Sequence, residues 1–380
     1  MINWDHNATT PLRAEVAALL VERISSGLPG NASSVHRLGR AARKALEQAR
    51  AQVAQVMGAE PREIVFAGSG SDAAALCLKG AYAARTEAGR TRVVISAVEH
   101  PAVMKAAAQL ERHGATVTRV APGTDGRVDA ARVSAALGPD VALCSLMWAN
   151  NETGVLQPVR EVAATCRGAG VTFHVDAVQA VGKVRVNLRE LNADLLTFAP
   201  HKFGGPAGVG VAVVRRGLPV EALVPGHQED GKRGGTPNVA LAEAAALALQ
   251  LADAGLDAWE ARVRPLRDAF EAGLRAALPG VHVHGEMAPR VANTTHARFD
   301  GADGEALLVA LDLEGICVST GAACASGSLA PSHVLTAMGL TPGQAHASVR
   351  FSLGHEATVQ EVERVLSVLR EAVPRARDAA

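Results

Sequence analysis

Residues 199–208 read APHKFGGPAG and lie between two short apolar runs, at 195–198 and 209–214. Uninterrupted apolar runs of this length are typical of strands that are covered on both faces. Lys202 is therefore expected in a glycine-rich turn just after a strand. Most lysines are solvated surface charges, so the residues at neighbouring strand ends must show whether this one has another role.

Similar runs alternate with helical segments along the first two thirds of the chain. Apolar residues recur at helical spacing over 33–57, and Gly58 is a stop signal. Alternation of strands and helices predicts an α/β fold with a doubly wound, mainly parallel sheet. The expected strands are 64–66, 93–96, 116–120, 141–147, 171–175, 195–198 and 209–214.

The pattern changes after about residue 257 to a smaller α+β arrangement. We therefore predict a large domain over 13–256 and a small C-terminal domain over 257–380, with residues 1–12 packing near the small one. The expected strands of the small domain are 281–284, 294–299, 317–320 and 349–353, with helices at 304–313 and 358–372.

The charge balance and the apolar stretches of the chain indicate which kinds of molecule it binds. The chain has 380 residues, with 38 basic and 38 acidic side chains, so no overall charge favours nucleic acid or an anionic membrane. The stretch 239–251 contains Glu243 and is too short to span a bilayer; it is expected to be a buried helix capped by Asn238. We expect a small-molecule substrate or a protein partner.

The five cysteines include no CxxC pair, and we expect no secretory leader. Reduced thiols and a cytoplasmic location are the expectation. No cluster with metal-ligand spacing accompanies the HVD triplet at 174–176, so no metal site is predicted. Four of the cysteines lie in apolar segments and are expected to be buried: Cys77, Cys144, Cys166 and Cys317.

In open α/β sheets, ligands bind at the carboxyl ends of the strands. After the first strand comes AGSGSD, in which Gly70 and Ser71 open a helix; this is either a phosphate site or a tight structural turn. After the second strand comes His100, followed by Pro101. His100 is either a stacking partner for a flat ligand or an ordinary histidine at a helix entry.

Two further strand ends carry polar side chains. Asn150 and Asn151 follow one strand, although asparagines are common in turns for local reasons. Asp176 and Gln179 follow the next. A single cofactor would use the whole set, because pyridoxal phosphate needs a lysine for its aldehyde, an acid for its ring nitrogen and donors for its phosphate. Lys202, Asp176 and the Gly70-Ser71 helix entry are candidates for these three roles.

With these residues in this order, the chain resembles the pyridoxal-phosphate-dependent cysteine desulfurases. These are fold-type-I enzymes of the class-V aminotransferase kind that supply sulfur for iron-sulfur clusters. The resemblance covers nearly the whole chain. Its motifs are DHNATTP at 5–11, GNASSVHRLGRAA at 30–42, AVEHPAV at 97–103, NNETGVLQP at 150–158, HVDAVQAVGK at 174–183, HKFGGPAGVG at 201–210, KRGGTPN at 232–238, STGAACASGSLAPSHVL at 319–335 and VRFSLGHEAT at 349–358.

The resemblance implies a role for each candidate. Lys202 would carry the cofactor, Asp176 would contact the pyridine nitrogen, Gln179 and Asn151 would lie near the ring hydroxyl, and His100 would stack on the ring and carry protons. Gly70, Ser71 and His201 would hold the phosphate, with Thr236 reaching the phosphate in a neighbouring subunit, which implies a homodimer. Arg350 would bind the substrate carboxylate, a task that suits its planar fork, and Asn151 would also contact the substrate.

Cys324 lies in the small-residue stretch STGAACASGS, whose composition suits a mobile loop that carries a thiol to its target. The stretch resembles the longer-loop group of the family, so Cys324 would take sulfur from L-cysteine as a persulfide. Three residues depart from the family pattern. Ala199 stands where a phosphate-binding serine is usual, and Ser71-Asp72 replaces threonine and glutamate. Weaker cofactor retention is the expected effect, with a neutral effect as the alternative.

The resemblance thus implies conversion of L-cysteine to L-alanine, with sulfur passed to an acceptor such as an iron-sulfur scaffold protein. An aminotransferase of the same fold would use Lys202, Asp176 and Arg350 but would need no loop thiol. A non-catalytic platform that binds sulfur-handling partners is a third possibility, favoured only by the altered phosphate turn and Ala199. Cysteine or selenocysteine as the preferred substrate is left open.

Overall fold

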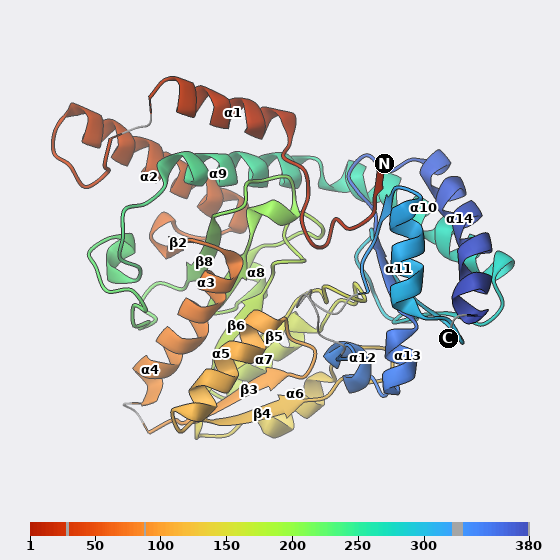
Figure 1. Cartoon of the computed structure of the whole chain (residues 1–380). Coiled ribbons are helices and arrows are strands. Elements are labelled where there is room, and N and C mark those ends of the chain that lie inside the picture. Colours follow the sequence, from red (N-terminus) through yellow and green to blue (C-terminus); the bar gives the residue numbers. More distant parts are fainter. Residues whose placement is uncertain (28–29, 87–88, 321–329, 379–380) are drawn as a thin grey trace.

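The computed structural model describes residues 1–27, 30–86, 89–320 and 330–378. A large sheet with helices on both faces occupies one side of the molecule, and a smaller group of helices and strands lies beside it (Figure 1). The N-terminal segment runs between the two parts before it reaches helix α1 (Figure 1).

The large sheet has seven strands in the order β2-β8-β7-β6-β5-β3-β4. All neighbouring pairs are parallel except those made by β8, which is antiparallel to β2 and β7. The prediction of a doubly wound, mainly parallel α/β sheet is confirmed. The strands are β2 (Ile64–Ala67), β3 (Arg92–Ser96), β4 (Thr116–Val120), β5 (Val141–Met147), β6 (Thr172–Asp176), β7 (Leu195–Phe198) and β8 (Gly210–Val214).

Successive residues of the central strands pack into two different cores, because side chains alternate across a sheet. Val93 and Ile95 face one core, whereas Val94 faces the other. Helices α3 (Gly70–Ala75), α4 (Ala81–Thr86) and α5 (Pro101–Arg112) cover the first face. The second face is covered by α2 (Arg37–Met57), α6 (Ala130–Ala136), α7 (Val159–Gly168), α8 (Leu188–Leu191) and α9 (Val239–Ala254).

The helix expected over 33–57 begins four residues later, at Arg37. The ring of His36 accepts a hydrogen bond from the Gly39 amide and caps the first turn. At the other end, Gly58 has φ 65°, the left-handed conformation that ends a helix as predicted. Helix α1 (Ala14–Ser25) packs against α9, whose first turn is capped by Asn238 as expected.

The C-terminal part contains an antiparallel sheet of the order β12-β10-β9 and a two-stranded parallel sheet of β1 and β11. Its separate core includes Trp4 from the N-terminal segment. The predicted boundary between residues 256 and 257 falls beside a 66° bend between α9 and α10 and remains a prediction. The elements are β1 (Ile2–Asn3), β9 (Val281–Val283), β10 (Thr294–Phe299), β11 (Ile316–Cys317), β12 (Ser348–Ser352), α10 (Leu256–Ala277), α11 (Gly304–Leu313), α12 (His333–Ala337), α13 (Pro342–His346) and α14 (Val359–Asp378).

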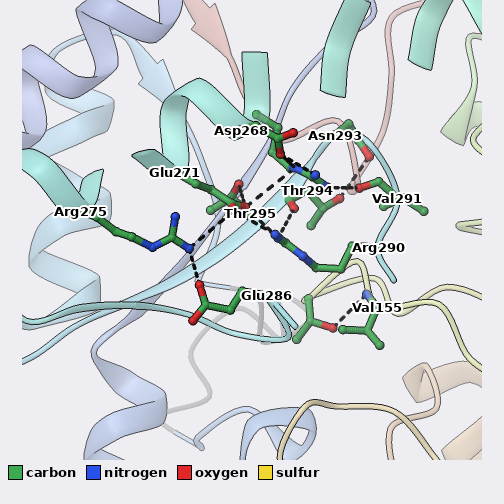
Figure 2. Close-up of polar contacts among 12 residues, drawn as sticks. Val155, Asp268, Glu271, Arg275, Glu286, Arg290, Val291, Asn293, Thr294 and Thr295 are labelled. Carbon is green, nitrogen blue, oxygen red and sulfur yellow. Dashed lines mark hydrogen bonds and ion pairs between the residues drawn. The ribbon is translucent and has the colours of Figure 1, made fainter. Parts of the chain in front are cut away.

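A buried ion pair lies next to the junction between the two parts. Glu271 of α10 receives two hydrogen bonds from the guanidinium of Arg290, at 2.7 and 2.9 Å (Figure 2). Around Arg290, the segment before β10 runs along the turn after β5: the Val291 amide donates to Gly154 O, and the Leu156 amide donates to Pro289 O. The ion pair therefore anchors the segment whose main chain bonds to the turn after β5.

The cysteine prediction holds for three residues and is wrong for the fourth. Cys77, Cys144 and Cys166 are buried, but Cys317 is partly exposed. Cys317 is the last residue of β11, which pairs only with the short edge strand β1 in the described part of the chain. The strand expected over 317–320 is correspondingly shorter, with Ser319 forming an isolated bridge to Arg350.

Among the helices that the structure describes, no single one combines the length and apolar character of a membrane span. Helices α9 and α10 have the length and apolar composition of a membrane span only when the two are taken together as a bent pair. Nine residues of α9 are buried.

Candidate active site

The carboxyl ends of the parallel strands border a cavity of about 330 Å³. Residues from both parts of the molecule line it, including Arg350 of β12. The structure thus brings together most of the predicted site residues: Gly70, Ser71, His100, Asn151, Asp176, Gln179, His201, Lys202 and Arg350. Thr236 is exposed in the segment before α9 and does not line this cavity, while Cys324 lies outside the described residues.

Lys202 ends a short 3₁₀ turn, Pro200–Lys202, that follows β7. Its Nζ donates to two main-chain carbonyls, Asn7 O at 2.9 Å and Ala8 O at 2.6 Å. Burial and the nearby Arg350 cation lower the pKa of Lys202 to about 8, against the opposing effects of Asp5 and Asp176. In a neutral amine, the two N–H groups would satisfy both carbonyls and leave the lone pair for reaction with an aldehyde.

Asp176 is the last residue of β6 and is buried at the floor of the site. One of its oxygens accepts the Val178 amide at 3.0 Å. Burial raises the pKa of Asp176 to about 6, against the effects of that hydrogen bond and of Lys202. A protonated pyridine nitrogen placed against this carboxyl would offset the burial and favour the ionised form. Asp176 therefore fits the acid that pyridoxal phosphate requires.

His100 precedes α5, and its Nδ1 accepts the Ala102 amide at 3.1 Å. In a neutral ring this hydrogen bond places the proton on Nε2. Burial is the main cause that lowers the pKa of His100 to about 4, with further contributions from Lys202, His333 and Lys105. The neutral ring lines the cavity, so it can contact a flat ligand and exchange a proton through Nε2.

The phosphate end of the cavity is the entry of α3. Ser69 caps this helix by accepting the Asp72 amide, and the remaining first-turn amides have no partner within the helix by geometry. A side chain on Gly70 would meet the Ala199 Cβ at 3.0 Å, which makes the entry a close fit around glycine. Asp72 turns back to accept the Gly68 amide at 2.8 Å, so its carboxylate supports the turn.

Arg350 is buried on the side of the cavity that belongs to the small sheet. Its Nη1 donates to Asn151 O at 3.0 Å, and its Nη2 donates to Asp5 Oδ1 at 2.6 Å. Its Nε is buried and has no hydrogen-bond partner among the described residues. Arg350 also lines the cavity, and a guanidinium in that position suits a carboxylate from a bound ligand.

Asn7 links most of these groups and was not among the predicted site residues. Its main-chain oxygen accepts from Lys202 and from Gln179 Nε2, while its Nδ2 donates to Asn151 O. Its Oδ1 accepts from Lys183 Nζ at 2.6 Å. The DHNATTP motif contains Asn7, but a sequence far from the strand ends gives no sign that it folds back onto them.

Lys183 and Glu99 are two further buried groups that sequence reasoning missed. Lys183 also donates to Gln179 Oε1 at 2.6 Å, four residues earlier. Burial lowers the pKa of Lys183 well below its usual range, with Lys202 and Arg350 acting in the same direction. Burial and the negative charge of Asp176 raise the pKa of Glu99 to about 8. The sequence offered two signs of a role near the site: Lys183 lies four residues after Gln179, and Glu99 directly precedes His100.

Comparisons with known proteins agree with this chemistry. The family model described as Aminotransferase class-V matches residues 2–365. Cysteine desulfurase 2 of Trichormus variabilis is 43% identical over 378 residues, covering 99% of this chain and 94% of that protein. The IscS-like cysteine desulfurase of Mycobacterium tuberculosis is 43% identical over 387 residues, covering 100% of this chain and 98% of that protein.

Solved structures give the same result. The NifS-like protein from Rickettsia africae superimposes with a TM-score of 0.88 at 30% identity, covering 98% of this chain and 99% of that one. A structure described as SspA in complex with cysteine gives a TM-score of 0.82 at 28% identity, covering 94% and 100% of the two chains. The chain belongs to the class-V aminotransferase family and, within it, to the pyridoxal-phosphate-dependent cysteine desulfurases.

Proposed function

We propose that this chain converts L-cysteine to L-alanine and transfers the sulfur to Cys324, from which it passes to an acceptor for iron-sulfur cluster or related biosynthesis. The observation that carries the proposal is the single cavity lined by Lys202, Asp176, His100 and Arg350. The names of the relatives support it, and the cysteine in the SspA complex supports the choice of substrate.

Pyridoxal phosphate, when bound, supplies an aldehyde for the substrate amine and a ring that accepts electrons from the α-carbon. Asp176 would stabilise the protonated ring nitrogen, and the α3 entry with His201 would hold the phosphate. Arg350 would bind the substrate carboxylate and so orient the α-carbon toward Lys202. The lowered pKa of Lys202 to about 8 favours an amine that can take up and return a proton near neutral pH.

The sulfur step needs a thiolate from the chain. The Cys324 thiolate would attack the substrate sulfur and form a sulfur–sulfur bond while the substrate carbon–sulfur bond breaks. The electrons of the broken bond stay with the carbon skeleton, which takes up protons and leaves as alanine. His100 is suited to one of these proton transfers, because its neutral ring lines the cavity.

The assembly and the location are also proposals. Thr236 is exposed, which supports contact with the phosphate in a second copy of the chain and hence a homodimer. A cytoplasmic location is consistent with three buried reduced cysteines. The sulfur acceptor would be a protein thiol, such as that of an iron-sulfur scaffold.

The experiment measures alanine formed from L-cysteine by the cofactor-loaded protein in the presence of a reductant. We expect repeated turnover by the parent chain and none by Cys324→Ala, which should keep the cofactor colour. Cys317→Ala is the matched control, because Cys317 is a partly exposed thiol of the same C-terminal part. Normal turnover by Cys324→Ala would contradict the role of Cys324, and amino transfer to pyruvate without desulfuration would favour the aminotransferase.

A further inference from the structure

The N-terminal segment reaches the wall of the cavity that carries Arg350. Strand β1 pairs with β11, and Asp5 forms a bridge to Ser352 of β12. Asp5 therefore lies beside β12 two residues from Arg350 along that strand. Its side chain is 27% exposed, whereas the side chain of Arg350 is 6% exposed. A partly solvated carboxylate thus contacts a buried cation.

Arg350 is held at both ends. Its main chain pairs with Ser319, and its guanidinium donates through Nη1 to Asn151 O and through Nη2 to Asp5 Oδ1. Asp5 provides the one carboxylate within ion-pair distance of Arg350 in the described part of the chain. Contacts at both Nη atoms fix the plane of the guanidinium, and they leave Nε as the buried donor without a partner among the described residues.

We propose that Asp5 is a positioning residue that fixes the guanidinium of Arg350 in the cavity wall, where it receives the α-carboxylate of the amino-acid substrate. This proposal rests on the proposed function in one respect, which is that the ligand is an amino acid. A charged hydrogen bond at 2.6 Å restricts rotation of the guanidinium more than the single contact at Asn151 O would alone. Pre-orientation of this kind lowers the cost of binding a carboxylate.

The contact between Asp5 and Arg350 also has an electrostatic effect that opposes carboxylate binding. Asp5 is an anion near the expected position of the substrate carboxylate, so removing it also removes repulsion between two negative charges. If Asp5 acted mainly as an internal competitor, its removal would strengthen binding of carboxylate ligands. The sign of the change in affinity therefore separates positioning from competition.

The test compares two amines that differ only in the carboxylate. L-Alanine and ethylamine are titrated into the cofactor-loaded protein, and the absorbance of the cofactor reports binding. The variants are Asp5→Ala, which removes the acceptor and the charge, and Asp5→Asn, which keeps an oxygen acceptor. Asp257→Ala is the matched control, because Asp257 pairs with Arg185 at 2.7 Å on the exposed surface. Thermal unfolding of each loaded variant checks that it is folded.

We expect Asp5→Ala to weaken L-alanine binding about tenfold, the usual effect of losing a charged hydrogen bond, and to leave ethylamine binding unchanged. Asp5→Asn should weaken L-alanine binding less, and Asp257→Ala should not change it. Unchanged or tighter L-alanine binding by Asp5→Ala, or an equal loss for both amines, would overturn the proposal.

Both amines bind at the position of Lys202. A change at Lys202 caused by the substitution would therefore alter both affinities alike and cancel in their ratio. The titration needs cofactor binding but no sulfur transfer. A chain that bound L-alanine through Arg350 and Asp5 but released no sulfur would refute the proposed function and leave this inference standing.

Discussion

The buried ion pair of Glu271 and Arg290 provides a sharp test of what stabilises the C-terminal part beside the junction. The Glu271 side chain is 6% exposed and the Arg290 side chain 5% exposed. Two direct hydrogen bonds link them, and the Thr295 hydroxyl donates a third to the carboxylate at 2.8 Å (Figure 2). Replacement of either partner leaves a buried charge behind, which typically costs about 3–5 kcal/mol.

The surroundings predict that the two replacements are unequal. Without Arg290, the Glu271 carboxylate still has Arg267 at 3.9 Å and Arg275 at 4.0 Å. Without the Glu271 charge, Arg290 keeps a 3.2 Å hydrogen bond to Thr294 O and has no second ion-pair partner among the described residues. We therefore expect Glu271→Gln to cost about 3–5 kcal/mol and Arg290→Met to cost about 1–3 kcal/mol.

Equilibrium denaturant unfolding of the cofactor-loaded protein measures both changes in free energy. The double variant Glu271→Gln with Arg290→Met should cost less than the sum of the two single variants, because it removes both charges together. Arg364→Met serves as a control, since Arg364 pairs with Glu314 where both side chains are 51% exposed, and it should change stability little. A larger loss for Arg290→Met than for Glu271→Gln would refute this reasoning.

Three further predictions concern the site. Because the pKa of Lys202 is lowered to about 8, uptake of pyridoxal phosphate by the apoprotein should accelerate as pH rises through 8; Arg350→Met should move this midpoint upward, since the Arg350 cation helps to lower that pKa. Burial lowers the pKa of Lys183, so as pH falls below about 10.4 the unfolded chain binds a proton that the folded chain does not. The parent should then lose up to about 1.4 kcal/mol of stability per pH unit relative to Lys183→Met, measured by unfolding at several pH values. Ala199→Ser, which adds a hydroxyl beside Gly70, should tighten cofactor binding about tenfold in equilibrium dialysis, and an unchanged affinity would favour the neutral alternative.

Sequence patterns predicted the large sheet well because its central strands are short, mostly apolar and buried on both faces. Each run, such as 141–147, contrasts clearly with the amphipathic helices around it. The position of strand ends then predicted that Asp176, His100 and Lys202 would meet, since parallel strands end at the same edge. The antiparallel direction of β8 was not predictable from its composition, which matches that of its parallel neighbours.

Contacts between distant segments were harder to predict. Asn7 and Asp5 reach Lys202 and Arg350 only because the N-terminal segment passes between the two parts of the molecule, and no local pattern encodes that path. Lys183 looks like an exposed residue by type, and only its two amide partners explain its burial. Cys317 was wrongly expected to be buried, because its apolar neighbours give no sign that β11 is a short edge strand.

The proposed function depends on the transfer of sulfur from L-cysteine to Cys324. The most direct measurement is the intact mass of the cofactor-loaded protein after one equivalent of L-cysteine, without reductant, followed by mapping of the modified peptide. We expect the chain to gain the mass of one sulfur atom on the peptide containing Cys324, while an equal amount of alanine is released. Alanine release with no added mass, or with the sulfur on Cys317, would contradict it.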